Sequence, residues 1–198
     1  MTRATTTPKR ATKEVTYEEY MAMPETNQFV EVVDGVIVEM AGPTVVHQVV
    51  SGRIYRKVDR YVEDRDLGLV IMGPADVLIR ELPKLRIRQP DVMFFSDERA
   101  GFRVTGDPDR VTHDRISPSL AVEVLSPGQN ERTLADKLAD YASIQVEEVW
   151  FADQETRTIR VLAREGGGYR PSGEFGIGDR VVSAVLPGID LDVAAVFA

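Results

Sequence analysis

The sequence predicts one α/β domain in which helices pack on a mixed β-sheet. Two observations carry this prediction. Apolar residues recur at helical spacing over residues 44–64, whereas residues 91–95 and 120–125 are short apolar runs with the length of covered strands. The chain has 198 residues, 43% of them hydrophobic, which is enough for one sizeable core. No repeat or change of composition divides it, so we expect a single domain over residues 15–198.

The start of the chain, residues 1–14, is expected to be a disordered basic tail. Its basic residues, which have no acidic residue among the first 13, are Arg3, Lys9, Arg10 and Lys13. The alternative is a basic arm that contacts nucleic acid. Thr16 and Glu19 then have the spacing of a capping box, which predicts a short helix that ends near Pro24.

A β-hairpin is predicted next, because the apolar runs 29–33 and 36–40 flank the pair Asp34-Gly35. A long helix is then predicted from Thr44 to about Asp64. Its apolar stripe consists of Val46, Val50, Ile54, Val58 and Tyr61 or Val62.

The remaining elements alternate between strands and helices. Strands are expected around Val70, at 77–79, 91–95, 120–125, 148–152 and 158–162, with a helix at about 131–143. Residues 97–118 are expected to be a polar excursion, because glycine and proline interrupt any periodicity there. A turn at 166–168, further short strands and a helical turn near Ala194 complete the chain.

Composition restricts the chemistry. The formal net charge of −8 argues against avid non-specific binding to nucleic acid at physiological salt. The lack of cysteine excludes disulfides, thiolate zinc sites and a cysteine nucleophile. With only His47 and His113, a metal site must consist mainly of carboxylates, which suit magnesium, manganese or calcium. No apolar run approaches the roughly 20 residues of a membrane span, and no signal peptide is evident, so we expect a cytoplasmic protein.

Three acidic residues stand inside apolar strands. Alternation places Glu123 on the same face as Ala121 and Leu125, where a carboxylate is costly unless it is paired or bound to metal. Asp91 opens the apolar run 91–95, and Glu31 lies within 29–33. A solvated sheet edge is the alternative for each residue alone, but three such acids indicate a shared polar pocket.

Lys137 completes this pattern. It lies on the inward side of the predicted helix 131–143, near Leu134 and one turn before Tyr141. A lysine there would face carboxylates such as Glu123, and the alternative is a surface ion pair with Asp140. Carboxylates and a backbone carbonyl can hold magnesium, and a lysine nearby can orient the water that attacks a phosphodiester.

At Gln89-Pro90-Asp91 and Val122-Glu123-Val124-Leu125 the chain resembles the PD-(D/E)XK nuclease superfamily. It resembles more closely a restriction-endonuclease branch called the Uma-two family, formerly a domain of unknown function. The resemblance runs from about Thr16 to Phe197. Its further landmarks, in order, are residues 29–35, Gly42-Pro43 before His47, Ser126-Pro127, Asp136-Lys137 with Tyr141, Val149-Trp150 and 186–189.

The chain departs from the superfamily pattern at Leu125, where a lysine is usual, and in the branch Lys137 of the following helix takes that place. Gln145 also replaces the usual small residue before Val146. The resemblance implies a restriction-endonuclease-like fold with a central mixed sheet flanked by helices, preceded by an N-terminal helix and β-hairpin.

The resemblance also implies roles. Asp91, Glu123 and the carbonyl of Val124 would bind Mg²⁺ or Mn²⁺, and Lys137 would position the water. Glu31 would orient the site or help to hold a second metal. His47 would contact the phosphate, or else be a hydrogen-bonded structural histidine. For Tyr141 and Trp150 a place in the core is favoured over stacking on bases.

These observations predict a divalent-metal-dependent endonuclease acting on nucleic acid, with DNA as the expected substrate and a homodimer for double-strand cutting. Two alternatives remain. One is a nuclease-fold module that binds nucleic acid or a protein without turnover, which the acidic charge favours. The other is a metal-dependent hydrolase of a small phosphorylated molecule.

Overall fold

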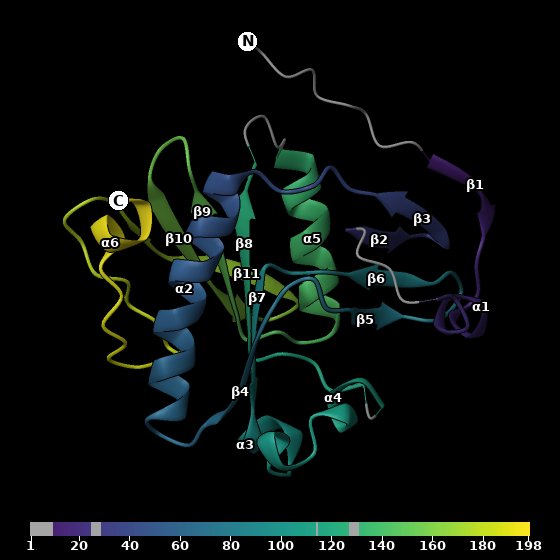
Figure 1. Cartoon of the computed structure of the whole chain (residues 1–198), viewed down its shortest axis with the longest axis horizontal. Helices are drawn as coiled ribbons and strands as arrows, with labels where there is room; N and C mark the ends of the chain where they lie inside the picture. Colours follow the sequence, from purple (N-terminus) through teal and green to yellow (C-terminus); the bar gives the residue numbers. More distant parts are fainter. Residues whose placement is uncertain (1–9, 25–28, 114, 127–130) are drawn as a thin grey trace.

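Two β-sheets with helices around them make up the computed structural model, which describes residues 10–24, 29–113, 115–126 and 131–198 (Figure 1). The larger sheet has the strand order β11-β10-β9-β8-β7-β4. Its strands are β4 (Gly68–Met72), β7 (Val92–Ser96), β8 (Leu120–Leu125), β9 (Glu148–Asp153), β10 (Thr158–Glu165) and β11 (Gly168–Phe175). Only β8 and β9 pair in parallel within it, so the predicted mixed sheet is confirmed.

A helix covers each face of this sheet. Residues Val92, Phe94, Val122 and Val124 share a core with Val50, Ile54 and Val58 of α2 (Val45–Glu63). Their neighbours on the opposite face, Met93, Phe95, Ala121 and Leu125, share a second core with Leu134 and Tyr141 of α5 (Glu131–Ser143). Because strand side chains alternate between faces, Glu123 points toward α5, as its spacing from Ala121 and Leu125 predicts.

The smaller sheet lies beside α5 on the right of Figure 1 and has the order β1-β3-β2-β6-β5. Its strands are β1 (Arg10–Glu14), β2 (Val30–Val33), β3 (Val36–Glu39), β5 (Val77–Arg80) and β6 (Arg86–Arg88). Asp34 and Gly35 join β2 to β3 with φ of 51° and 79°, the left-handed pair that a tight hairpin turn requires. The predicted hairpin is therefore confirmed.

Several short helices complete the structure: α1 (Tyr17–Met21), α3 (Asp97–Ala100), the 3₁₀ helix η1 (Val104–Gly106), α4 (Asp109–His113) and α6 (Val193–Phe197). The capping box predicted for the first helix is present, since Thr16 and Glu19 each accept from the other's backbone N–H. Both long helices also agree with prediction. No helix within the described ranges has the length and apolarity needed to cross a membrane.

Two predictions need correction. Residues 10–14, which fall within the predicted disordered tail, form β1, which pairs antiparallel with β3 along the free edge of the hairpin. The rest of the predicted tail, residues 1–9, lies outside the described residues. Residues 97–118, predicted to be a polar excursion without periodicity, contain α3, η1 and α4. Each of these helices is too short to show a helical period in the sequence.

Candidate active site

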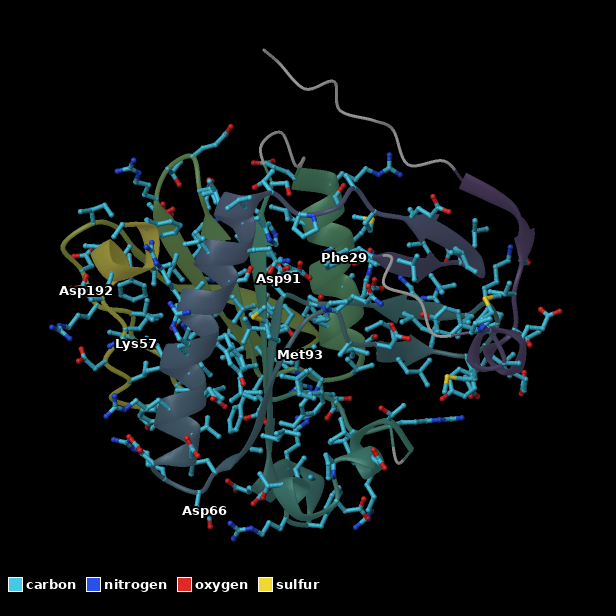
Figure 2. All side chains as sticks on the ribbon, in the orientation of Figure 1. Phe29, Lys57, Asp66, Asp91, Met93 and Asp192 are labelled. Carbon is cyan, nitrogen blue, oxygen red and sulfur yellow. The ribbon has the colours of Figure 1, made fainter. Side chains whose placement is uncertain are left out.

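The strand pairing of the larger sheet brings Asp91 next to Glu123. Asp91 precedes β7, whose Val92 pairs with Val122 of β8. The Asp91 N–H donates to the carbonyl of Val122 at 3.0 Å, and its Oδ2 accepts the N–H of Val124 at 2.7 Å. Figure 2 shows Asp91 between the ribbons of α2 and α5. Backbone hydrogen bonds thus fix this carboxylate at the point where β8 presents Glu123.

Lys137 links two of the predicted acids. Its Nζ donates to Glu123 Oε2 at 2.7 Å and lies 3.2 Å from Glu31 Oε1. The side chains of Lys137, Glu123 and Glu31 are each only 6% exposed. Neither acid therefore lies on a solvated edge, and Lys137 does not form the alternative surface pair with Asp140.

Asp140 instead belongs to a buried ion network that the sequence reasoning missed. Its carboxylate contacts Arg86 Nε at 2.6 Å and Arg88 Nη2 at 2.6 Å. Arg88 Nη1 also lies 2.5 Å from Glu31 Oε2. The sequence did contain a sign of this network, because Arg86 and Arg88 alternate with apolar residues in a short segment. The same kind of alternation predicted the burial of Glu31 and Glu123.

Tyr141 is a second site residue that was not predicted as one. It is fully buried, and its hydroxyl donates to Glu123 Oε1. It lies one helical turn after Lys137, so one face of α5 supplies both donors to Glu123. The core position predicted for Tyr141 is thus confirmed, and so is that of Trp150, whose Nε1–H donates to buried Glu148.

His47 contacts the same cluster from the opposite side. It lies in the first turn of α2, where its N–H is accepted by the capping hydroxyl of Thr44. Its Nε2 is 3.5 Å from Asp91 Oδ2, and Ser51 Oγ donates to its carbonyl at 2.9 Å. The structure therefore brings His47 to the three acids and Lys137.

Residues 17–194 match the model of the Uma2 family, described as "Putative restriction endonuclease". The chain belongs to the Uma2 family. A solved structure from Anabaena variabilis ATCC 29413, described as a "putative nuclease" of DUF820, superposes with a TM-score of 0.71. It is 17% identical, and the match covers 92% of this chain and 97% of that one, which shows a shared fold. No curated protein matches the chain.

Electrostatics separate the acids of this Uma2 site into two kinds. Burial acts to raise the pKa of Glu31, but Lys137 and Arg88 outweigh it and hold that pKa below its usual value. Burial raises the pKa of Glu123 despite Lys137, because the carboxylates of Asp91 and Glu31 add to the effect. Glu31 is thus compensated by cations, whereas Glu123 carries a charge that an additional cation would stabilise.

The pKa values of two basic groups are raised at this site. Burial opposes the charge of Lys137, but Glu123 and Glu31 outweigh it and raise its pKa. Burial likewise acts to lower the pKa of His47, but Asp91, the Val124 carbonyl and Glu123 raise it above its usual value. Both shifts favour the protonated form of a basic group close to the acids of the site.

The donor atoms of the site suit a hard divalent cation. Asp91, Glu123 and the Val124 carbonyl offer only oxygen, which fits magnesium or manganese. Across the part of the chain that the structure describes, no three His, Asp or Glu side chains form a metal site by themselves. A cation held here would therefore need the backbone carbonyl and water in addition to the two carboxylates.

A cavity of about 650 Å³ lies elsewhere in the structure. It is lined by residues such as Ser96, Asp97 and Glu147, at the opposite end of β7 from Asp91. None of the residues that meet around Lys137 lines it. This cavity is therefore separate from the candidate active site.

Proposed function

We propose that this protein is a divalent-metal-dependent endonuclease that hydrolyses phosphodiester bonds, with DNA as its substrate. One observation carries the proposal: buried Lys137 lies between Glu31 and Glu123, and Glu123 in turn neighbours Asp91. Burying this many charges is costly in a small domain and is common at catalytic sites. Membership of the Uma2 family supports the same reaction class.

We assign metal binding to Asp91, Glu123 and the carbonyl of Val124. Their oxygen donors suit Mg²⁺ or Mn²⁺, and burial and the neighbouring carboxylates raise the pKa of Glu123, so a bound cation would stabilise its ionised form. A divalent ion held by these residues would supply Lewis acidity, activating water and offsetting the negative charge of the phosphate. Glu31 orients this group of residues through Lys137.

Lys137 is assigned to the attacking water. An ammonium group has three N–H donors, and two of them point to Glu123 and Glu31. The third is available in this proposal to hold the water or a phosphate oxygen in line with the bond that breaks. Because both carboxylates keep Lys137 positively charged, it stabilises the charge that develops on the phosphate without acting as a base.

His47 is assigned to the phosphate. It is next to Asp91, and its raised pKa favours the imidazolium form, which is a donor to anionic oxygen.

The first test is cleavage of supercoiled plasmid at low salt by wild type and Asp91→Ala, with Mg²⁺, Mn²⁺ or EDTA. We expect nicking by wild type that EDTA abolishes and that Asp91→Ala lowers at least a hundredfold, since a metal ligand is lost. Asp64→Ala, an exposed acid beside the C-terminal end of α2, is the control and should cut normally. An Asp91→Ala protein that cuts like wild type contradicts the proposal.

A second function is favoured by the net charge of −8, which is unusual for a protein that binds phosphates. It is a nuclease-fold module that binds nucleic acid or protein without turnover. Binding that persists in EDTA and in Asp91→Ala, with intact plasmid throughout, would support it. Double-strand cutting in turn requires two sites, so the nuclease proposal includes a homodimer, which light scattering tests.

A further inference from the structure

Arg88 connects two acids that belong to different parts of the fold. Its Nη1 lies 2.5 Å from Glu31 on β2, and its Nη2 lies 2.6 Å from Asp140 on α5. The Arg88 side chain is only 5% exposed, so water does not weaken these contacts. A planar guanidinium has donors in fixed directions, and Arg88 therefore sets the distance between Glu31 and the helix that carries Lys137.

Glu31 has a cation at each of its oxygens. Oε2 meets Arg88, and Oε1 meets Lys137 at 3.2 Å. Lys137 also lies between Glu31 and Glu123, so an ammonium group separates Glu31 from the carboxylates assigned to metal. A carboxylate that two cations already neutralise gains less from a metal ion than one that faces another acid.

We propose that Arg88 is a positioning residue, which holds Glu31 so that Glu31 orients Lys137 and does not bind metal. This inference rests on the proposed function, because Lys137 must serve the reaction for its orientation to matter. Arg88 itself touches neither the nucleic acid nor the metal in this account. Arg88 acts only through the carboxylate of Glu31, which in turn orients the amine of Lys137.

The chain offers a matched control. Arg86 lies on the same strand as Arg88, has a side chain 11% exposed and pairs with the same Asp140 at 2.6 Å. Its second acidic partner is Asp34 at 3.3 Å, and no contact of Arg86 with Glu31 or Lys137 occurs among the described residues. Arg86→Gln therefore removes a comparable charge and leaves the contacts of Lys137 intact.

The test compares wild type, Arg88→Gln and Arg86→Gln in three measurements. Turnover on plasmid should fall about tenfold or more in Arg88→Gln and stay within about twofold in Arg86→Gln, with KM unchanged in both. Calorimetry with Mn²⁺ should give the same dissociation constant, within about twofold, for all three proteins. The ammonium resonance of Lys137, recorded on ¹⁵N-lysine protein, should persist in Arg86→Gln and shift or exchange rapidly in Arg88→Gln.

Glu31→Gln serves as the second variant and replaces Arg88→Gln if circular dichroism shows that the latter does not fold. It keeps the shape of the side chain, so we expect lower turnover with unchanged Mn²⁺ affinity. Mn²⁺ affinity that falls about tenfold in Glu31→Gln would make Glu31 a ligand and overturn the inference. Equal losses of turnover in the two arginine variants would also overturn it, since the network would then be only structural.

Failure of the proposed function has a different signature. A wild type that cuts no substrate contradicts the nuclease, whatever the variants do. The lysine resonance does not depend on cleavage, so it still decides whether Arg88 holds Lys137. An unchanged resonance in Arg88→Gln rejects the inference in either case.

Discussion

At the scale of single residues, most contacts of the site converge on Glu123. Lys137 donates to one of its oxygens and Tyr141 to the other, while Asp91 lies close enough to act on its charge. A buried carboxylate with two such donors is held in one orientation, which a metal ligand requires. The two donors come from one face of α5, four residues apart.

We therefore expect Tyr141→Phe to lower both stability and cleavage. The free energy of unfolding should fall by about 1–3 kcal/mol, because a donor to a buried carboxylate is lost, and cleavage should slow about tenfold. Urea denaturation and plasmid nicking measure the two effects. Tyr169→Phe is the control, because its hydroxyl donates to the Val146 carbonyl at 2.7 Å away from the site. It should lose stability without slowing cleavage.

The pKa of Glu31 gives a prediction about pH. Because that pKa is lowered in the folded protein, the ionised form stabilises the fold above the unfolded value of about 4.3, and this contribution is lost as pH falls through the folded value. Glu31→Gln should thus cost about 3 kcal/mol at pH 7, and the difference from wild type should shrink toward pH 3. Urea titrations across this range measure it. A difference that is constant with pH would contradict the assigned ion pairs.

At the scale of elements, α5 ends in a way that its sequence does not favour. The Val146 N–H donates to the Tyr141 carbonyl at 3.0 Å, and Gln145 has a φ of 62°, in the left-handed region. This closing turn favours glycine, because a side chain there strains the backbone. Gln145 thus occupies the position where the resemblance implied a small residue.

Gln145→Gly should accordingly raise the free energy of unfolding by up to about 1 kcal/mol, since relief of the left-handed strain exceeds the entropy that glycine adds to the unfolded chain. A higher melting temperature with unchanged cleavage is the expected result. Gln145→Ala, which keeps a Cβ at this φ, should give no such gain.

Elements with a clear period could be predicted from the sequence. α2, α5, the β2–β3 hairpin and β8 all lie where periodicity or turn residues place them. β6 could not be found this way, because its three residues are too few for a pattern and two of them are arginines. β1 could not be predicted either, because its sequence shows no apolar alternation. Backbone pairing with β3 holds it in place, and such pairing leaves no pattern of side chains.

The same limits apply to the candidate site. Glu31, Asp91, Glu123 and Lys137 were identifiable because each charge interrupts an apolar face. Arg88, Asp140 and Tyr141 were not, because their importance depends on which residues they meet across two sheets and a helix. Such contacts are set by packing and leave no local spacing in the chain.

At the scale of the whole molecule, a net charge of −8 bears on the proposed binding of nucleic acid. Long-range repulsion of nucleic acid is screened by salt, whereas contacts that release counterions are weakened by it. If local cations such as His47 and Lys137 dominate, affinity for DNA should fall about tenfold between 50 and 200 mM salt. Fluorescence anisotropy with Asp91→Ala measures this without cleavage. Affinity that rises with salt would show that repulsion dominates.

The ion network from Asp34 to Glu123 joins two sheets, and its position has a consequence for when the protein can act. Glu31 and Arg88 come from the smaller sheet, Asp91 and Glu123 from the larger one, and Lys137 from the helix between β8 and β9. Lys137 is the last of these five residues to be added during synthesis. Until then the growing chain contains Glu31 and Glu123 without the lysine that pairs with both. The proposed cleavage, which depends on this lysine, would therefore begin only after α5 had been made and both sheets had packed against it.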